Sequence, residues 1–178
     1  MNPLHVFLAI AAFLATELAA MLIHKYVMHG IGWGWHKSHH VRRHGIWEKN
    51  DLYAIVFSVA TLLLFILGGT HAPLWWVALG ISVYGLLYGL LHDVLVHQRL
   101  PFRWRVRNRY IKHLVTAHHL HHASTARHGG VSFGFLYAPS LSKIRRRMRQ
   151  EIEQKTQQGV QQKTRQKVQH QVQHPETT

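Results

Sequence analysis

The chain has 178 residues, a length typical of a single domain, and a formal net charge of +14. It contains no cysteine, which excludes disulfides, thiolate zinc sites and cysteine-ligated iron–sulfur clusters. Its seven acidic residues form no Glu-x-x-His pattern, so the carboxylate-rich di-iron site of soluble helical bundles is excluded as well. The net positive charge is typical of proteins that bind nucleic acid or an anionic membrane surface. Long apolar runs beside the basic stretches favour the membrane.

Three apolar runs predict three membrane-spanning helices. The first run, residues 3–23, is long enough at 1.5 Å per residue to cross a hydrocarbon core of about 30 Å. A cleaved signal peptide is the alternative, but no Lys or Arg precedes this run. Residues 52–67 and 74–91 form two shorter runs, and the turn between them, which contains Gly and Pro, predicts a membrane hairpin.

The predicted hairpin returns the chain to the side of the membrane at which the first helix ends. Residues 24–51 contain five Lys or Arg residues, whereas the hairpin turn contains none. The positive-inside rule therefore predicts that this side faces the cytoplasm and that the N-terminus lies outside. A soluble protein with these helices as its core is the alternative, although few other apolar residues remain to cover them. Residues 1–140 are thus predicted to form an all-α, integral membrane helical domain with three clear spans.

Three further segments follow the third predicted span. Residues 99–112 interleave six Arg or Lys residues with aromatic residues, a pattern that can bind single-stranded nucleic acid but that next to a span favours lipid headgroups. Residues 131–139 are apolar but too short to cross a membrane, so they are predicted to form a fourth, interfacial or re-entrant segment. Residues 141–178 form a basic, Gln-rich tail that is predicted to be helical at the membrane surface or disordered.

Two histidine clusters, residues 24–40 and 92–122, carry the strongest functional signal. Each consists of an H-x4-H pair followed by an H-x2-H-H triplet. The ten histidines are His24, His29, His36, His39, His40, His92, His97, His118, His121 and His122. Both clusters follow predicted spans on the same side of the membrane, so two half-sites of five imidazoles predict two metal ions held between them. Imidazole suits iron, zinc and copper alike.

Helical geometry accounts for the triplets more readily than for the pairs. Residues i, i+3 and i+4 lie within about 100° on a helix, so each triplet presents its imidazoles on one face. Residues i and i+5 diverge by about 140°, so the pairs require either an altered helix end or one histidine of each pair that reaches the other metal. Asp93, directly beside His92, is predicted to accept a ring N–H and to fix the tautomer, with an ordinary helix-end carboxylate as the alternative.

The order and spacing of these boxes resemble the membrane fatty acid hydroxylase superfamily, and more closely the bacterial β-carotene 3-hydroxylases. The matching stretches are HKYVMHG, WHKSHH, HDVLVHQRLP and AHHLHHA, followed by VSFGFLYAPSLS. The resemblance covers most of residues 15–145 and leaves out the Gln-rich tail. It implies a non-haem di-iron monooxygenase, in the bacterial inner membrane with its site on the cytoplasmic side, whose two iron ions are held by the ten histidines.

The resemblance also implies a substrate and partners. O2 would hydroxylate carbon 3 of a β-ionone ring, converting β-carotene through β-cryptoxanthin to zeaxanthin and, with 4-keto rings, canthaxanthin to astaxanthin. Electrons would come from a ferredoxin-type donor fed by NAD(P)H, since the chain has neither cysteines for a cluster nor a Gly-rich dinucleotide motif. The carotenoid would enter from the bilayer. Candidate substrate contacts, for which core packing is the alternative, are Phe133, Phe135, Leu136 and Tyr137.

Three other functions remain as alternatives. A fatty acid or sterol hydroxylase or desaturase of the same superfamily would share the histidine boxes. A histidine-rich metal transporter would place its ligands within a membrane pathway, whereas these clusters follow the spans. A lipid-anchored nucleic-acid binder would use the basic stretches, although no nucleic acid is expected at a site of this kind. No catalytic residue beyond the metal ligands is predicted.

Overall fold

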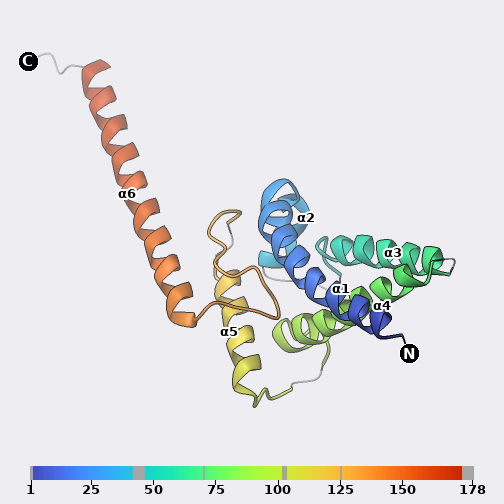
Figure 1. Cartoon of the computed structure of the whole chain (residues 1–178). Helices are drawn as coiled ribbons and strands as arrows, with labels where there is room; N and C mark the ends of the chain where they lie inside the picture. Colours follow the sequence, from blue (N-terminus) through green and yellow to red (C-terminus); the bar gives the residue numbers. More distant parts are fainter. Residues whose placement is uncertain (1, 42–46, 70, 102–103, 125, 174–178) are drawn as a thin grey trace, which may run out of the picture.

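Figure 1 shows the computed structural model of the chain, a helical body from which one long helix projects. The structure describes residues 2–41, 47–69, 71–101, 104–124 and 126–173, and these residues form helices and no strands. The elements are α1 (Pro3–Leu22), η1 (Ile23–Ile31), α2 (Trp33–His40), α3 (Asp51–Gly68), α4 (Ala72–Tyr88), η2 (Gly89–Val96), α5 (Arg109–His122) and α6 (Leu141–Gln173). The predicted all-α class is confirmed.

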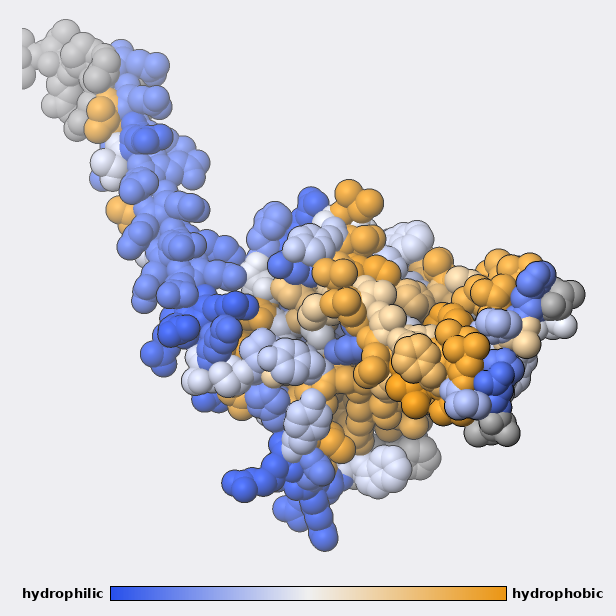
Figure 2. Space-filling model, in the orientation of Figure 1, coloured by the Kyte–Doolittle hydropathy of each residue, from blue (hydrophilic) through white to orange (hydrophobic). Residues whose placement is uncertain are grey.

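Three helical stretches are long and apolar enough to cross a membrane: Pro3–Ile31, which has a kink at Gly30, Asp51–Gly68 and Ala72–Val96. They contain the three predicted spans. The first and third extend beyond the apolar runs because α1 continues into η1 and α4 into η2. Large apolar side chains along them stay exposed, as Ile10 (56%), Leu62 (59%) and Ile66 (63%) illustrate. Figure 2 shows this hydrophobic surface on the body, while the projecting helix is hydrophilic. Such a surface is the one expected against lipid.

Helix α4 packs against both α1 and α3. Small residues permit this contact. A Cβ at Gly80 of α4 would collide with the backbone carbonyl of Ala9 in α1, and Ala78 is completely buried nearby in the chain. Close approach through small residues is the usual way for helices to associate within a membrane, where burial of apolar surface gives no driving force. The packing places the end of α1, the start of α3 and the end of α4 at one end of the body.

The two elements η1 and η2 are π-helical, with backbone hydrogen bonds between residues five apart. His97 N donates to His92 O over 2.9 Å, and Gly32 N donates to Val27 O over 2.8 Å. Because a π-helix has more residues per turn than an α-helix, residues i and i+5 lie closer to the same face of the helix. This is an altered helix end of the kind that the H-x4-H spacing required, and it occurs at both pairs.

The described residues between α5 and α6 contain no regular secondary structure. The start of α6 packs on α5 around buried Ala117, Val131 and Ile144. Beyond this contact most of the described side chains of α6 are exposed, and Figure 1 shows the helix pointing away from the spans. The tail is therefore helical as far as Gln173, and residues 174–178 lie outside the described residues.

Candidate metal centre

The ten predicted histidines converge at the end of the spans. Nine of them form two groups, and within each group the potential ligand nitrogens all lie within 4.8 Å of one another. Group 1 consists of His24, His29, His36, His40 and His121, and group 2 consists of His39, His92, His97 and His118. The tenth, His122, lies between the groups. Its Nε2 is 2.8 Å from that of His118, and its ring stacks on that of His40 with centroids 4.4 Å apart.

The two groups do not coincide with the two sequence clusters. The middle histidine of each triplet crosses over: His39 joins group 2, and His121 joins group 1. Both members of each H-x4-H pair stay together, His24 with His29 and His92 with His97. Of the two possibilities that the sequence left open for the pairs, the altered helix end is the one present.

Acceptors outside the groups fix the tautomers of most of these imidazoles. Six Nδ1 atoms lie within hydrogen-bond distance of oxygen acceptors: His24 with Phe133 O (3.1 Å), His29 with Arg127 O (2.9 Å), His36 with Asn50 Oδ1 (2.7 Å), His39 with Glu48 Oε2 (2.9 Å), His40 with Ser124 O (2.8 Å) and His92 with Asp93 Oδ1 (2.9 Å). Carbonyl and carboxylate oxygens only accept, so each Nδ1 carries the proton and donates. Each Nε2 therefore presents a lone pair toward the interior of its group.

These inward lone pairs face one another at short range. His36 Nε2 is 3.1 Å from the Nε2 atoms of both His24 and His40, and His39 Nε2 is 3.0 Å from His92 Nε2. Two facing lone pairs repel unless a cation lies between them. Two imidazole nitrogens about 2.1 Å from one ion and at right angles are about 3.0 Å apart. The donor set of each group therefore fits a metal ion.

Burial favours the neutral form of seven of these imidazoles. Removal from water lowers the pKa of His36 to about 3, that of His40 to about 4 and that of His97 to about 3. Burial, reinforced by the neighbouring imidazoles, also lowers the pKa values of His39, His118, His121 and His122. The neutral form is the one that binds metal, so the site needs no proton release near neutral pH.

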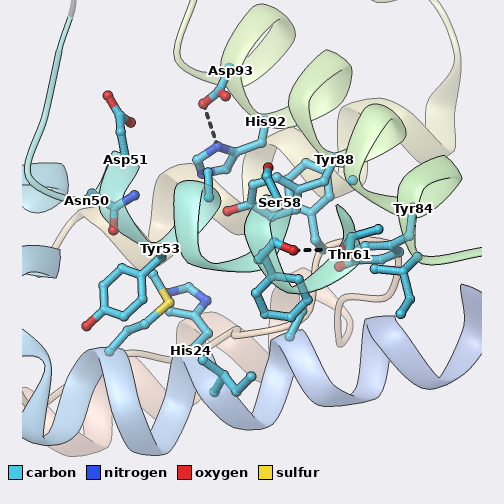
Figure 3. Close-up of a pocket in the computed structure, with 18 of the residues that line it drawn as sticks. His24, Asn50, Asp51, Tyr53, Ser58, Thr61, Tyr84, Tyr88, His92 and Asp93 are labelled. Carbon is cyan, nitrogen blue, oxygen red and sulfur yellow. Dashed lines mark hydrogen bonds and ion pairs between the residues drawn. The ribbon is translucent and has the colours of Figure 1, made fainter. Parts of the chain in front are cut away.

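A cavity of about 500 Å³ borders both groups. Its lining includes His24 from group 1 and His92 and His118 from group 2. Figure 3 shows His24 and His92 on opposite sides of the cavity, with Thr61 and Tyr84 farther along it between the spans. A ligand in this cavity would therefore touch apolar helices at one end and the histidine groups at the other.

The candidate substrate contacts divide into two pairs. Phe133 and Phe135 line the cavity, whereas Leu136 and Tyr137 are absent from its lining, and Tyr137 is 66% exposed. The two phenylalanine rings also lie against different groups. Phe133 is 5.2 Å from the ring of His121, and Phe135 is 5.5 Å from that of His92.

Comparison with known proteins decides the family. The chain is 52% identical over 149 residues to a beta-carotene hydroxylase of Pantoea ananas, a match that covers 83% of each chain. It is 51% identical over 144 residues to a beta-carotene hydroxylase of Paracoccus sp. (strain N81106 / MBIC 01143), covering 80% of this chain and 89% of that protein. The chain belongs to the beta-carotene hydroxylase family.

A more distant relative of the family is the chloroplastic beta-carotene 3-hydroxylase of Haematococcus lacustris, 37% identical over 139 residues, which cover 74% of this chain and 42% of that protein. No protein-family model matches the chain, and no solved structure gives a significant match. Membership in a hydroxylase family makes the chain an enzyme, and the transporter and nucleic-acid alternatives lose their basis.

Arg99 links the two carboxylates that bind histidines of group 2 in this hydroxylase, and the sequence analysis did not single out this residue. Its guanidinium pairs with Asp51 at 2.7 Å, with Glu48 at 3.2 Å and with Asp93 at 3.5 Å. Glu48 and Asp93 are the carboxylates that accept from His39 and His92. The contact predicted for Asp93 is thus present, and it belongs to a larger network.

Contact with lipid headgroups was predicted for the stretch that begins at Arg99, and for this residue the prediction is wrong. Its side chain is 14% exposed and is held among three carboxylates. One sequence signal was available: Arg99 lies two residues after the predicted ligand His97. The backbone carbonyls of Ser124, Arg127 and Phe133 were missed too, and a carbonyl acceptor leaves no signal in the residue type.

Proposed function

We propose that this enzyme hydroxylates carbon 3 of the β-ionone ring of carotenoids, using O2 at a non-haem di-iron site held by the ten histidines. The substrates would be β-carotene and then β-cryptoxanthin, giving zeaxanthin, and with 4-keto rings canthaxanthin, giving astaxanthin. The observation that carries the proposal is a cavity between apolar helices that ends at both histidine groups, in a chain about half identical to beta-carotene hydroxylases.

The chemistry of the substrate matches the side chains present. A ring C–H bond offers no acidic proton and no electrophile, so a nucleophile or a general base would have nothing to attack. A bound iron pair supplies oxygen activation, the chemistry needed to hydroxylate such a bond. The histidines would hold the metals through Nε2, and the acceptors at Nδ1 keep six of the ten rings in the tautomer that can do so.

The cavity is suited to one end of a carotenoid. A volume of about 500 Å³ falls within the usual range for small-molecule sites, about 300–1,000 Å³. Leu62 lines the cavity and is also 59% exposed, so the cavity reaches the lipid-facing surface of α3. One ring can enter while the polyene stays among lipid and helix side chains. The two rings of one molecule would then be hydroxylated in separate binding events.

The proposal includes a location and an electron source. The spans would cross the bacterial inner membrane and place the metal centre on the cytoplasmic side, where the chain has its basic residues. The reaction consumes reducing equivalents, and the chain has no cysteine to hold an iron–sulfur cluster of its own. A ferredoxin-type donor fed by NAD(P)H would supply them.

Pigment analysis tests the proposal. The protein is produced in cells that make β-carotene, the pigments are separated, and iron is measured on the purified protein. We expect β-cryptoxanthin and zeaxanthin, with about two iron ions per chain for the ten ligands. An unchanged β-carotene pool together with newly hydroxylated or desaturated fatty acids or sterols would instead favour the other branch of the superfamily.

A further inference from the structure

Glu17 is an ionisable residue within the first membrane-spanning helix, and it is engaged on both carboxyl oxygens. Its Oε1 accepts from three consecutive backbone N–H groups, those of Phe135 (2.9 Å), Leu136 (2.9 Å) and Tyr137 (3.2 Å). Its Oε2 accepts from the hydroxyl of Tyr84 in α4 over 2.7 Å. One side chain of α1 thereby joins a span to a non-helical segment more than a hundred residues away.

The contact lies within the membrane-spanning part of α1, where backbone N–H groups need an acceptor from the protein itself. Glu17 precedes His24 by seven residues, which is about two turns or about 10 Å on nearly the same helix face. Residues 133–137 are non-helical, so their N–H groups have no partners within a helix of their own. Non-helical backbone at membrane depth is tolerated only where the protein satisfies its polar groups. Glu17 satisfies three of them at once.

Close fit confirms that the segment is held against α1. A Cβ at Gly134 would lie 3.2 Å from Glu17 Oε1 and 2.5 Å from the backbone oxygen of Tyr137. Glycine is needed at this turn chiefly because of the backbone oxygen of Tyr137, and the Glu17 carboxyl group also lies close. Glu17 therefore holds part of the apolar segment 131–139, which the sequence predicts to be interfacial or re-entrant, against α1.

The anchored segment carries the cavity wall. Phe133 lies against His24, with ring centroids 5.4 Å apart, and its carbonyl accepts from His24 Nδ1. Phe135 lies against His92 of group 2 and against Tyr88 of α4, at 5.5 and 4.7 Å. One short segment thus places one aromatic ring beside each histidine group, and both rings line the cavity.

We propose that Glu17 is a positioning residue: its carboxyl group clamps residues 133–137 to α1 and α4, and so holds Phe133 and Phe135 as the wall that orients a carotenoid ring toward the metal centre. The role for the ring rests on the function proposed above. The clamp itself does not, since it consists of contacts within the chain.

Cysteine labelling tests the clamp without using activity. The chain has no cysteine, so Ser132→Cys introduces a single thiol next to the segment at a position that is 4% exposed. With Glu17 present, we expect slow reaction with a water-soluble maleimide in purified, folded protein. Adding Glu17→Ala should accelerate the labelling at least about tenfold, because three backbone hydrogen bonds are lost and the segment opens.

Neighbouring substitutions serve as matched controls for the labelling. Thr16→Ala changes the adjacent buried residue, whose hydroxyl bonds only within α1 to Ala12 O, and it should leave the labelling rate unchanged. Glu17→Gln keeps an acceptor oxygen but not the charge, so its rate should lie between those of wild type and Glu17→Ala. Equal labelling rates in the Glu17→Ala and wild-type backgrounds would overturn the clamp.

Turnover per bound iron then tests the positioning role. We expect Glu17→Ala to lower kcat per iron by up to about a hundredfold, as a misplacement of about 1 Å can do, with iron content per folded chain retained. Glu17→Gln should recover part of that loss. Unchanged kcat per iron in a variant with accelerated labelling would show that the clamp is only structural. If wild-type protein makes no hydroxylated carotenoid, the proposed function fails, and the labelling result still decides the clamp.

Discussion

His39 of α2 and His92 of η2 present their Nε2 atoms to each other at 3.0 Å, although they come from different histidine clusters. His121 makes the reciprocal contact, with its Nε2 3.1 Å from that of His29. Each metal site would therefore contain ligands from both halves of the chain. Each donor set is therefore complete only when the hairpin has returned η2 and α5 to the end of α1.

This exchange predicts which double substitutions lose both metals. His121→Ala should remove one of two ions, because it removes a donor from group 1. Adding His24→Ala, in the same group, should cost no second ion, whereas adding His92→Ala, in group 2, should leave the protein without metal. Metal content per folded chain, measured after gel filtration, gives the answer. Loss of both ions in the first double variant and of one in the second would mean that the sites follow the sequence clusters.

Much of this fold was predictable because it depends on local patterns. Hydropathy identifies the spans, and the i, i+3, i+4 spacing identifies the faces of α2 and α5, since both depend only on residue type and helical repeat. The exchange of His39 and His121 was not predictable, because it depends on how α2 and α5 are rotated about each other. The π-helical form of η1 and η2 was only a possibility, since α- and π-helices share the same side-chain preferences.

The residues that support the site were harder to predict than the ligands. Arg99 is one of six Arg or Lys residues in its stretch, and its contacts with carboxylates of other parts of the chain depend on the fold. Glu17 interrupts the first apolar run, and an ionisable residue in a span is a functional signal in itself. Its partners could not be predicted, because they are backbone N–H groups of a distant segment.

Removing Arg99 should destabilise the protein and weaken metal retention. Arg99→Leu leaves Glu48, Asp51 and Asp93 close together without their cation, and loss of one partner from a buried charge network costs about 3 kcal/mol. Thermal unfolding in detergent, with metal loss followed in parallel, measures both effects. Arg107→Gln is the matched control, because it removes an exposed arginine from the same basic stretch and should change the free energy of unfolding by less than about 0.5 kcal/mol. Equal effects of the two substitutions would contradict the network.

Gly80 should tolerate no side chain. A methyl group there meets the carbonyl of Ala9, so Gly80→Ala must separate α1 from α4 and lower the free energy of unfolding by about 1–3 kcal/mol. Gly85→Ala, five residues later in the same helix, is the control. No atom lies within 4 Å of a Cβ at that position, so its stability should be unchanged or slightly raised. The thermal midpoints of the two variants in the same detergent make the comparison, and equal midpoints would mean that the close contact does not stabilise the helix pair.

Acid should destabilise the metal-free protein over a defined range of pH. An imidazole in the unfolded chain has a pKa of about 6.5. Burial holds the pKa values of His36 and His97 at about 3 and that of His40 at about 4 in the folded chain. Between these limits the unfolded chain binds more protons at these three histidines than the folded chain does, so their contribution to the free energy of unfolding falls as pH falls from about 6.5 and levels off near about 3. Above about pH 7 these groups should contribute no pH dependence.

Bound metal should resist this acid effect until protons displace it. Protons and the ion compete for the same Nε2 atoms, so the metal-loaded protein should keep its stability to lower pH and then lose stability together with its metal. The measurement is the thermal midpoint against pH for metal-loaded and chelator-treated protein, with metal content followed at each pH. A midpoint for the metal-free protein that stayed constant from pH about 7 to about 4 would mean that the histidine groups take up protons without unfolding, and that the buried, neutral state described for them does not hold in solution.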